Sequence, residues 1–363
     1  MTIIIKPTFN CNFRCTYCYL TNAVKADCYM MRTDSIVRLI NQLIDCFPSH
    51  KNLTLLWHGG EPLLWGIQNF RKIFEYTEAI KSTLTIRHSI QTNLSLITDD
   101  YISLFKEYNV RVGFSFDGMK DINDLQRKSI HGKGTFDLIL EKLALCRKQG
   151  VRPGAIIVAT KNFKGRIKEL YDFLCLHELN FKFNPLFAAG EASALDSLAI
   201  TPAEYAEMAI ELFDLWFYDK YHSLKESTFI DIASYFLSKK KIARSCMLGQ
   251  NCQRNFIAIS PRGDVFPCGR FCETDATFSF GNINRLPLKD ILQKRFDSQM
   301  FKREKYIEQG NCVKCSYYGL CHGGCLHDGF LVNHDFKTKT FLCHAYKLIF
   351  GHIERSLKES NLI

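Results

Sequence analysis

Short apolar segments alternate with longer amphipathic segments over the first 186 residues. The short segments are rich in β-branched and aromatic residues and end at turn residues, which is typical of strands. The longer segments repeat apolar residues at helical spacing. We expect strands at residues 3–9, 53–58, 86–92, 111–117, 155–159 and 181–185. We expect helices at residues 33–47, 67–81, 98–108, 135–148 and 166–178.

Strand–helix units of this length predict a parallel sheet that is covered by helices. Six such strands indicate an α/β fold, either an open sheet or a partial (β/α)6 TIM-like barrel. In both arrangements the reactive groups lie at the carboxyl ends of the strands. Polar and cysteine-containing motifs fall at several of these ends, which supports the strand assignment.

The pattern changes after residue 200. Helices are expected at 202–221 and 229–241, a β-hairpin at 255–259 and 264–267, and a final helix at 343–357. Cysteine, glycine and proline become more frequent from residue 244 onward. We therefore divide the chain into an N-terminal domain, residues 1–225, and a C-terminal cysteine-rich domain, residues 226–363.

Composition narrows the range of possible functions. The chain has 363 residues, of which 47% are hydrophobic, so it can bury a substantial core and is not a disordered chain. It has neither an 18-residue apolar stretch nor a signal peptide, so we expect a cytoplasmic protein without a membrane partner. Disulfides are rare in the cytosol, so the 16 cysteines are expected to be metal ligands, catalytic thiols or buried side chains. Metal-bound thiolates would offset part of the net charge of +10, which is not taken as a sign of nucleic acid binding.

Three cysteines follow the first expected strand at CX3CX2C spacing: Cys11, Cys15 and Cys18. Three thiolates in one loop can bind three irons of a cubane cluster and leave the fourth iron open to a cofactor or substrate. Three unrelated thiols are the alternative. The second expected strand ends in His58-Gly59-Gly60-Glu61-Pro62. Two glycines permit a close backbone approach and the carboxylate can bind an ammonium group, although an ordinary strand-to-helix turn has the same composition.

Together the two motifs resemble the radical S-adenosylmethionine (SAM) superfamily, over nearly the whole chain. The resemblance implies that Cys11, Cys15 and Cys18 ligate a [4Fe–4S] cluster that binds SAM. It implies an aromatic contact near the adenine, a motif for the methionine amino group and further SAM contacts. Polar side chains at the end of the third strand are expected to face the same cavity, although ordinary polar lining is an alternative for some of them. These cofactor-binding residues are Tyr17, Gly59, Gly60, Glu61, Gln91, Asn93, Ser115, Arg127 and Leu186.

The family cleaves SAM reductively to a 5′-deoxyadenosyl radical, which abstracts a hydrogen from the substrate. By resemblance, the electron comes from a low-potential donor such as flavodoxin or ferredoxin. The protein contributes positioning and exclusion of water, while the cofactor supplies the chemistry.

A second cysteine constellation lies in the C-terminal region. It comprises Cys246-X5-Cys252, Gly263-X4-Cys268, Cys312-X2-Cys315-X5-Cys321-X3-Cys325 and finally Cys343. A pair of zinc sites, with His322, His327 or His344 as further ligands, is one interpretation. The complete order resembles the SPASM extension of peptide-modifying radical SAM enzymes, which holds two auxiliary [4Fe–4S] clusters and would bring the total to three.

The resemblance also implies how these eight cysteines are shared between the two clusters. Cys246, Cys252, Cys268 and Cys325 would ligate the first auxiliary cluster, and Cys312, Cys315, Cys321 and Cys343 the second. Five cysteines stay outside these sets. Cys46, Cys146 and Cys175 are expected to be small buried side chains within helices. For Cys28 and Cys272 a functional role stays open.

The resemblance over the full length is to anaerobic sulfatase-maturating enzymes, which oxidise a Ser or Cys of a sulfatase to formylglycine. Their pattern places an aspartate, the proposed base, directly after the hairpin cysteine. Here Gly269 follows Cys268, so the catalytic residue is unknown. We therefore expect a ribosomally made precursor peptide as substrate and an intramolecular crosslink, a cyclophane or thioether, as product. Sulfatase maturation is the alternative, and a non-catalytic metal-binding scaffold is a third possibility.

Overall fold

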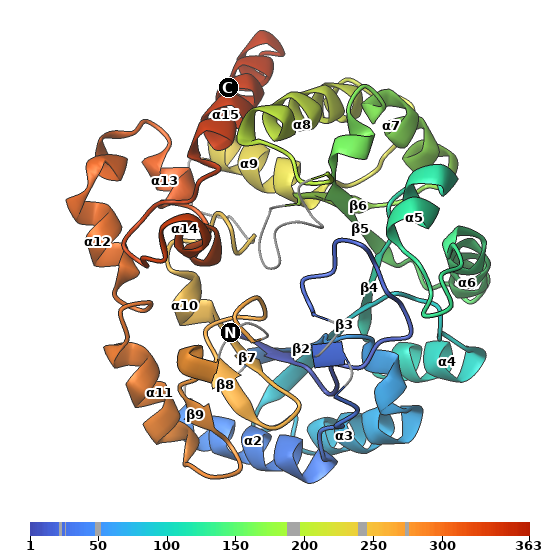
Figure 1. Ribbon diagram of the computed structural model, residues 1–363, viewed down its shortest axis with the longest axis vertical. Helices are drawn as coiled ribbons and strands as arrows, with labels where there is room; N and C mark the ends of the chain where they lie inside the picture. Colours follow the sequence, from blue (N-terminus) through green and yellow to red (C-terminus); the bar gives the residue numbers. More distant parts are fainter. Residues whose placement is uncertain (22–23, 26, 48–51, 187–196, 239–244, 273–275) are drawn as a thin grey trace. The chain divides into compact units, whose positions relative to one another are not determined.

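The computed structural model describes residues 1–21, 24–25, 27–47, 52–186, 197–238, 245–272 and 276–363. The chain forms two compact units, each made of separated segments (Figure 1). The first unit comprises residues 1–115, 128–153 and 253–301. The second unit comprises residues 116–127, 154–252 and 302–363. The division of the chain into domains at residue 225 stays a prediction.

The first unit contains a sheet with the strand order β4-β3-β2-β1-β7-β8-β9. Strands β1 to β4 are mutually parallel, β7 runs parallel to β1, and β7, β8 and β9 pair antiparallel. The predicted hairpin is therefore present, and it continues the sheet on the far side of β1. The strands are β1 (Thr2–Ile5), β2 (Asn52–Trp57), β3 (Thr85–Thr92), β4 (Arg111–Ser115), β7 (Phe256–Ile259), β8 (Asp264–Phe266) and β9 (Gly281–Asn282).

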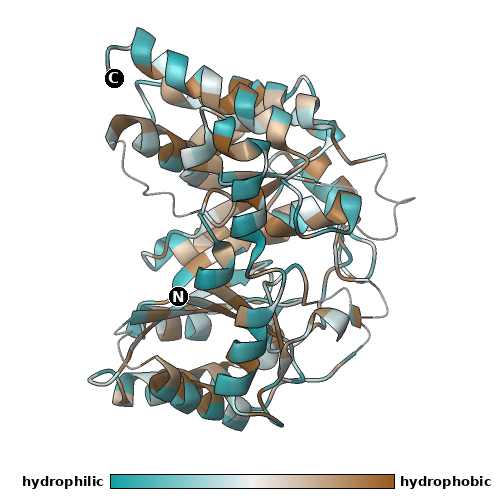
Figure 2. Cartoon of the chain, turned by 90° about the vertical axis from the view of Figure 1, so that its left-hand side faces the viewer, coloured by the Kyte–Doolittle hydropathy of each residue, from teal (hydrophilic) through white to brown (hydrophobic). Residues whose placement is uncertain are grey.

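Amphipathic helices cover this sheet. In α2 the buried residues Ile36, Leu39, Ile40 and Leu43 recur at the spacing of a single helix face. Figure 2 shows hydrophobic and hydrophilic residues mixed along such helices, because one face of an amphipathic helix packs on the core and the other faces solvent. The helices of the first unit are α2 (Thr33–Cys46), α3 (Ile67–Ala79), α4 (Asp99–Glu107), α6 (Phe136–Lys148) and α11 (Leu288–Asp297), with the 3-10 helices η1 (Pro62–Trp65) and η4 (Ala276–Phe278).

An aromatic cluster fills the core between the sheet and α3. The Trp57 and Trp65 rings stack with centroids 5.4 Å apart, and Phe70 meets Trp57 edge to face. Trp57 Nε1 donates a 3.2 Å hydrogen bond to His88 Nδ1, and the Thr77 hydroxyl lies 2.9 Å from His88 Nε2. His88 is therefore a core residue with both ring nitrogens partnered, and burial lowers its pKa to about 3.

The second unit contains the parallel strands β5 (Gly154–Ala159) and β6 (Phe181–Pro185). Helix α15 packs against α8 and α9, and α7 packs against α8. Helix α8 begins with a reciprocal capping box between Thr201 and Glu204. The helices are α5 (Lys120–Gln126), α7 (Ile167–Leu176), α8 (Pro202–Phe217), α9 (Ser227–Ser238), α10 (Cys252–Asn255, which runs into the first unit), α12 (Arg303–Gln309), α13 (Tyr318–Cys321), α14 (Leu326–Asn333) and α15 (Cys343–Glu359), with η2 (Lys161–Phe163) and η5 (Asn311–Lys314).

Most predicted elements are present within a few residues of their expected bounds. The first strand is shorter than predicted and ends at Ile5, because Pro7 has no backbone N–H to continue the ladder. Helix α8 ends at Phe217 rather than at residue 221. Residues 239–241 of the predicted helix 229–241 lie outside the described residues. Among the helices of the described ranges, none combines the length and apolar character needed to cross a bilayer.

Candidate cofactor site and cysteine centres

The loop after β1 carries the three cysteines at CX3CX2C spacing. All three thiols are partly buried, and the Cys18 N–H donates to the Cys15 carbonyl at 3.2 Å. Burial, the Glu61 carboxylate and the neighbouring Cys15 and Cys18 thiols raise the pKa of Cys11 to about 12. Three thiolates so close together need a compensating positive charge, which iron supplies. The donor set therefore fits the cluster expected from the sequence.

Two backbone contacts hold this cysteine loop against residues 128–130. The Arg14 N–H donates to the Lys128 carbonyl at 2.7 Å, and the Ile130 N–H donates to the Asn12 carbonyl at 3.1 Å. The Arg14 guanidinium also donates to the Cys11 carbonyl at 2.7 Å. The loop is thus fixed by hydrogen bonds through its backbone.

The glycine motif at the end of β2 lies directly against the chain that leads into the cysteine loop. The Gly60 N–H donates to the Thr8 carbonyl at 3.1 Å, and the Glu61 N–H donates to the Asn10 carbonyl at 2.8 Å. A Cβ atom on Gly60 would lie 2.2 Å from the carbonyl oxygens of Phe9 and Asn10. Only glycine fits this approach, so the packing of the two segments requires glycine at residue 60.

The Glu61 carboxylate is fully buried and accepts hydrogen bonds at both of its oxygens. Oε1 accepts from the Leu63 N–H at 3.0 Å and from the Thr92 hydroxyl at 2.6 Å, while Oε2 accepts from the Asn93 N–H at 2.7 Å. The side chain therefore fixes the end of β3 relative to the end of β2. A contact between this motif and the methionine amino group stays a prediction.

The polar residues at the ends of β3 and β4 form two linked groups. The Asn93 amide donates to Asn12 Oδ1 at 2.8 Å and approaches Cys11 Sγ at 3.8 Å, which ties β3 to the cysteine loop. Gln91 Nε2 donates to Ser115 Oγ at 3.1 Å. Gly113 makes room for this pair, because a Cβ there would lie 2.5 Å from Gln91 Oε1.

The remaining expected SAM contacts lie in different parts of the chain. Tyr17 is buried within the cysteine loop of the first unit. Arg127 directly follows α5 and Leu186 directly follows β6, and both are buried in the second unit. The Leu186 N–H donates to the Ala159 carbonyl at 2.9 Å, so Leu186 is held at the ends of both strands. The SAM contacts themselves stay predictions.

Lys6 is a site residue that the sequence reasoning missed. It follows β1 and is buried, with Nζ donating to the Gly269 carbonyl at 2.8 Å and lying 5.3 Å from the Tyr19 ring centroid. Burial lowers the pKa of Lys6 to about 8, although the thiols of Cys272, Cys268 and Cys18 oppose this shift. A lysine at the end of an apolar strand was the available signal in the sequence.

Four cysteines of the second unit line a single cavity of about 340 Å³. They reach it from η5, from the turn that follows η5, from the end of α13 and from the first residue of α15. His322, Gly323 and Gly324 all have positive φ and reverse the chain after α13. Four thiols around one cavity fit the ligand set of a [4Fe–4S] cluster. These cysteines are Cys312, Cys315, Cys321 and Cys343.

Arg303 lies beside this cysteine region and was also missed. Its buried guanidinium donates to the carbonyls of Gly323, Gly324 and Thr338 at 2.9 to 3.1 Å. Burial lowers the pKa of Arg303, whereas thiols from both predicted auxiliary sets, Cys252 and Cys325 as well as Cys321 and Cys312, oppose this shift. A fixed positive charge thus lies among cysteines that would carry negative charge when bound to iron.

The first predicted auxiliary ligand set is divided between the two units. Cys246, Cys252 and Cys325 belong to the second unit, and Cys268 belongs to the first. Cys268 follows β8 in the predicted hairpin, and Gly269 follows it. The grouping of these four cysteines around one cluster stays a prediction.

Comparison with known proteins identifies two domain families in the chain. Residues 5–174 match the radical SAM superfamily, and residues 246–316 match the SPASM iron–sulfur cluster-binding domain. The chain is 26% identical over 362 residues to the cysteine-type anaerobic sulfatase-maturating enzyme of Clostridium novyi, covering 96% of this chain and 94% of the relative.

Two solved structures give the same fold. That of native anSMEcpe with bound AdoMet has a TM-score of 0.85 and 24% identity, covering 99% of this chain and 98% of the other. Streptococcus suis SuiB bound to its precursor peptide SuiA has a TM-score of 0.65 and 18% identity, covering 94% and 75% of the two chains. The expected partial barrel with a C-terminal SPASM domain is therefore confirmed. The chain belongs to the radical SAM superfamily and is an enzyme that combines a SAM-binding iron–sulfur core with a SPASM domain.

Proposed function

We propose that this enzyme oxidises a Ser or Cys side chain of a peptide or protein substrate to formylglycine. The observation that carries the proposal is a match of nearly full length to a cysteine-type anaerobic sulfatase-maturating enzyme. The match extends through the cysteine loop, the glycine motif and the cysteine-rich region. This order of candidates reverses the one expected from the sequence, which put peptide crosslinking first.

The cysteine loop and the ends of β2 and β3, all in the first unit, have defined roles in this proposal. The SAM-binding cluster is held by Cys11, Cys15 and Cys18. Hydrogen bonds of Glu61 and Asn93 hold the ends of β2 and β3 against the cysteine loop. When bound, the cluster and SAM supply the radical that removes a hydrogen from the substrate. The protein's own contribution is to hold the cofactor in a fixed position and to exclude water.

The cysteine-rich region holds two auxiliary clusters in this proposal, which makes three per chain. The cavity lined by Cys312, Cys315, Cys321 and Cys343 supports the second of them. Arg303 lies among these thiols, and its charge would offset part of the negative charge that bound thiolates bring. A low-potential donor such as flavodoxin or ferredoxin would provide the electron for each turnover.

Peptide crosslinking is the second candidate, and Gly269 is the observation that favours it. In the related pattern an aspartate, the proposed base, follows the hairpin cysteine. Here the Cβ direction of Gly269 points toward Ile4 and Lys6, with Lys6 Cε 3.8 Å from the ideal Cβ position. A buried lysine therefore lies beside the residue at which the related pattern has an aspartate. A cyclophane or thioether product would fit this difference, since the reaction need not use that particular base.

The test is anaerobic incubation of the purified enzyme with SAM, a low-potential reductant and a peptide carrying a sulfatase-type Cys or Ser. Formation of a crosslink and oxidation of Ser to an aldehyde each lower the peptide mass by two hydrogens, so tandem mass spectrometry is combined with a hydrazine probe. A complete fragment series with a hydrazone supports formylglycine formation. A gap in the fragment series of a precursor peptide, without a hydrazone, supports crosslinking instead. A complete fragment series without a hydrazone for the sulfatase-type peptide would overturn the proposal.

A further inference from the structure

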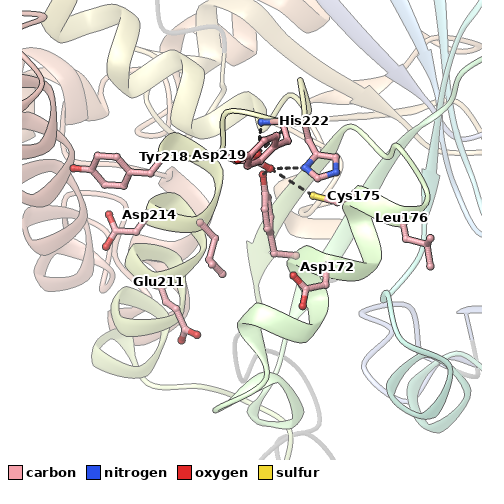
Figure 3. A pocket seen from close by; sticks show the side chains of 11 residues that line it. Asp172, Cys175, Leu176, Glu211, Asp214, Tyr218, Asp219 and His222 are labelled. Atoms are coloured by element: carbon pink, nitrogen blue, oxygen red, sulfur yellow. Dashed lines mark hydrogen bonds and ion pairs between the residues drawn. The ribbon is translucent and has the colours of Figure 1, made fainter.

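A cysteine, an aspartate and a histidine lie together in the second unit, in a cavity that shares no lining residue with the cavity around Cys312. Cys175 comes from α7, and Asp219 and His222 come from the segment after α8 (Figure 3). One ligand atom of each lies within 4.8 Å of the other two. The cavity that they line has a volume of about 720 Å³. The sequence suggested only a small buried side chain at Cys175.

Asp219 is oriented by hydrogen bonds to both of its carboxylate oxygens. Oδ1 accepts from the backbone N–H groups of Tyr221 at 2.7 Å and His222 at 3.2 Å. Oδ2 accepts from the Tyr171 hydroxyl at 2.7 Å and lies 2.7 Å from His222 Nδ1 and 3.9 Å from Cys175 Sγ. The backbone contacts thus direct Oδ2 toward the imidazole and the thiol (Figure 3).

The charge around the cavity favours a cation. Asp172, Glu211 and Asp214 also line it, and among the described lining residues there is no Lys or Arg. Asp172 pairs with Lys168, and Asp214 lies 2.6 Å from His352 Nε2, so part of this negative charge is compensated. The carboxylate of Asp219 stays ionised: burial alone would raise its pKa, but the Tyr171, Tyr221 and His222 hydrogen bonds hold that pKa well below its usual range.

The donor types identify the class of ion. Thiolate, imidazole and carboxylate together suit zinc, whereas calcium and magnesium prefer oxygen ligands alone. Three protein ligands with an open fourth position are common at zinc sites that admit water. The His222 side chain is 45% exposed, so solvent can reach that fourth position.

We propose that Cys175, Asp219 and His222 bind one zinc-like divalent cation, at a site distinct from the iron–sulfur centres. On binding, the Cys175 thiol releases its proton to solvent. Asp219 and His222 exchange their mutual hydrogen bond for bonds to the metal. Tyr171 continues to donate to the Asp219 carboxylate and keeps it oriented. The ion would fasten α7 to the segment after α8 and stabilise this part of the second unit.

The test is a zinc titration of the full-length, cluster-loaded protein in competition with a chromophoric chelator. We expect one zinc per chain beyond the cluster sites, and X-ray absorption at the zinc edge with one sulfur among nitrogen and oxygen ligands. Cys175→Ser and His222→Ala should each weaken binding at least about 100-fold. Their iron and sulfide content should equal that of the wild type. His222→Ala removes a partly exposed side chain, so the test does not depend on folding of the Cys175 variant.

Cys46→Ser is the matched control, because Cys46 is another partly buried helical thiol outside this cavity. It should bind zinc as the wild type does. The proposal is overturned if the wild type binds no such zinc or if both ligand variants bind it unchanged. A zinc environment made of sulfur alone would also overturn it, since that result would place the metal in vacant cluster sites.

Discussion

The Glu61 carboxylate and the backbone N–H of Asn93 form a 2.7 Å hydrogen bond inside the first unit. The Asn93 side chain then donates to Asn12 and approaches the Cys11 thiol. A single chain of contacts therefore connects the end of β2, the end of β3 and the cysteine loop. Since the Glu61 carboxylate is fully buried, the partners of its two oxygens depend on it for a hydrogen bond.

Glu61→Gln should destabilise the protein and weaken SAM binding. A glutamine has only one acceptor oxygen, so at least one of the donors Leu63 N–H, Thr92 hydroxyl and Asn93 N–H loses its partner. We expect a loss of about 1–3 kcal/mol in the free energy of unfolding. Chemical denaturation and equilibrium dialysis with SAM measure the two effects. Glu107→Gln, at an exposed ion pair with Arg71, should change neither.

Gly60→Ala should abolish the cofactor site rather than merely weaken it. The added Cβ would lie 2.2 Å from two backbone carbonyl oxygens, which cannot move aside as a flexible side chain can. We expect loss of cluster iron from the first site and no cleavage of SAM. Gly154→Ala is the control, because its Cβ would meet only one atom, at 3.9 Å. Wild-type activity in Gly60→Ala would mean that this close approach is not required.

Replacing Cys312, Cys315, Cys321 and Cys343 together with alanine should remove one cluster. Three clusters correspond to about 12 iron atoms per chain, and this variant should retain about 8. Iron and acid-labile sulfide are measured on anaerobically purified protein. Cys146→Ala, a buried helical thiol, serves as the control and should keep the full iron content. An unchanged iron content in the fourfold variant would mean that this cavity does not hold a cluster.

Gly269→Asp should increase formylglycine formation if the missing base limits that reaction. The ideal Cβ at residue 269 makes only ordinary contacts, at 3.5 Å to Ile4 and 3.8 Å to Lys6, so the substitution fits. The new carboxylate would lie beside the Lys6 ammonium group, and the pair would stay ionised. We expect at least a tenfold gain in aldehyde product, measured as the hydrazone. Gly269→Asn has nearly the same size without the charge and should give no gain.

The sequence predicted the alternating strands and helices because their apolar residues follow the periods of strand and helix. The cysteine spacings likewise indicated iron–sulfur ligands, because ligands that lie in one loop are also close together along the sequence. Lys6 could not be assigned a role, because its partner Gly269 is 263 residues away and only folding brings them together. The surroundings of Cys175 were not predictable for the same reason: its neighbours Asp219 and His222 follow a different helix.

His88 should make stability depend on pH in the mildly acidic range. Burial lowers its pKa from 6.5 to about 3, so between these values the unfolded chain binds one proton more than the folded protein does. His88 therefore lowers the free energy of unfolding by about 1.4 kcal/mol between pH 7.5 and pH 5.5.

In His88→Gln the free energy of unfolding should change with pH by about 1.4 kcal/mol less than in the wild type, measured by denaturant unfolding at both pH values. Because the clusters are present in both proteins, their own response to acid cancels in the difference. An unchanged slope in His88→Gln would mean that the buried imidazole accepts a proton without unfolding.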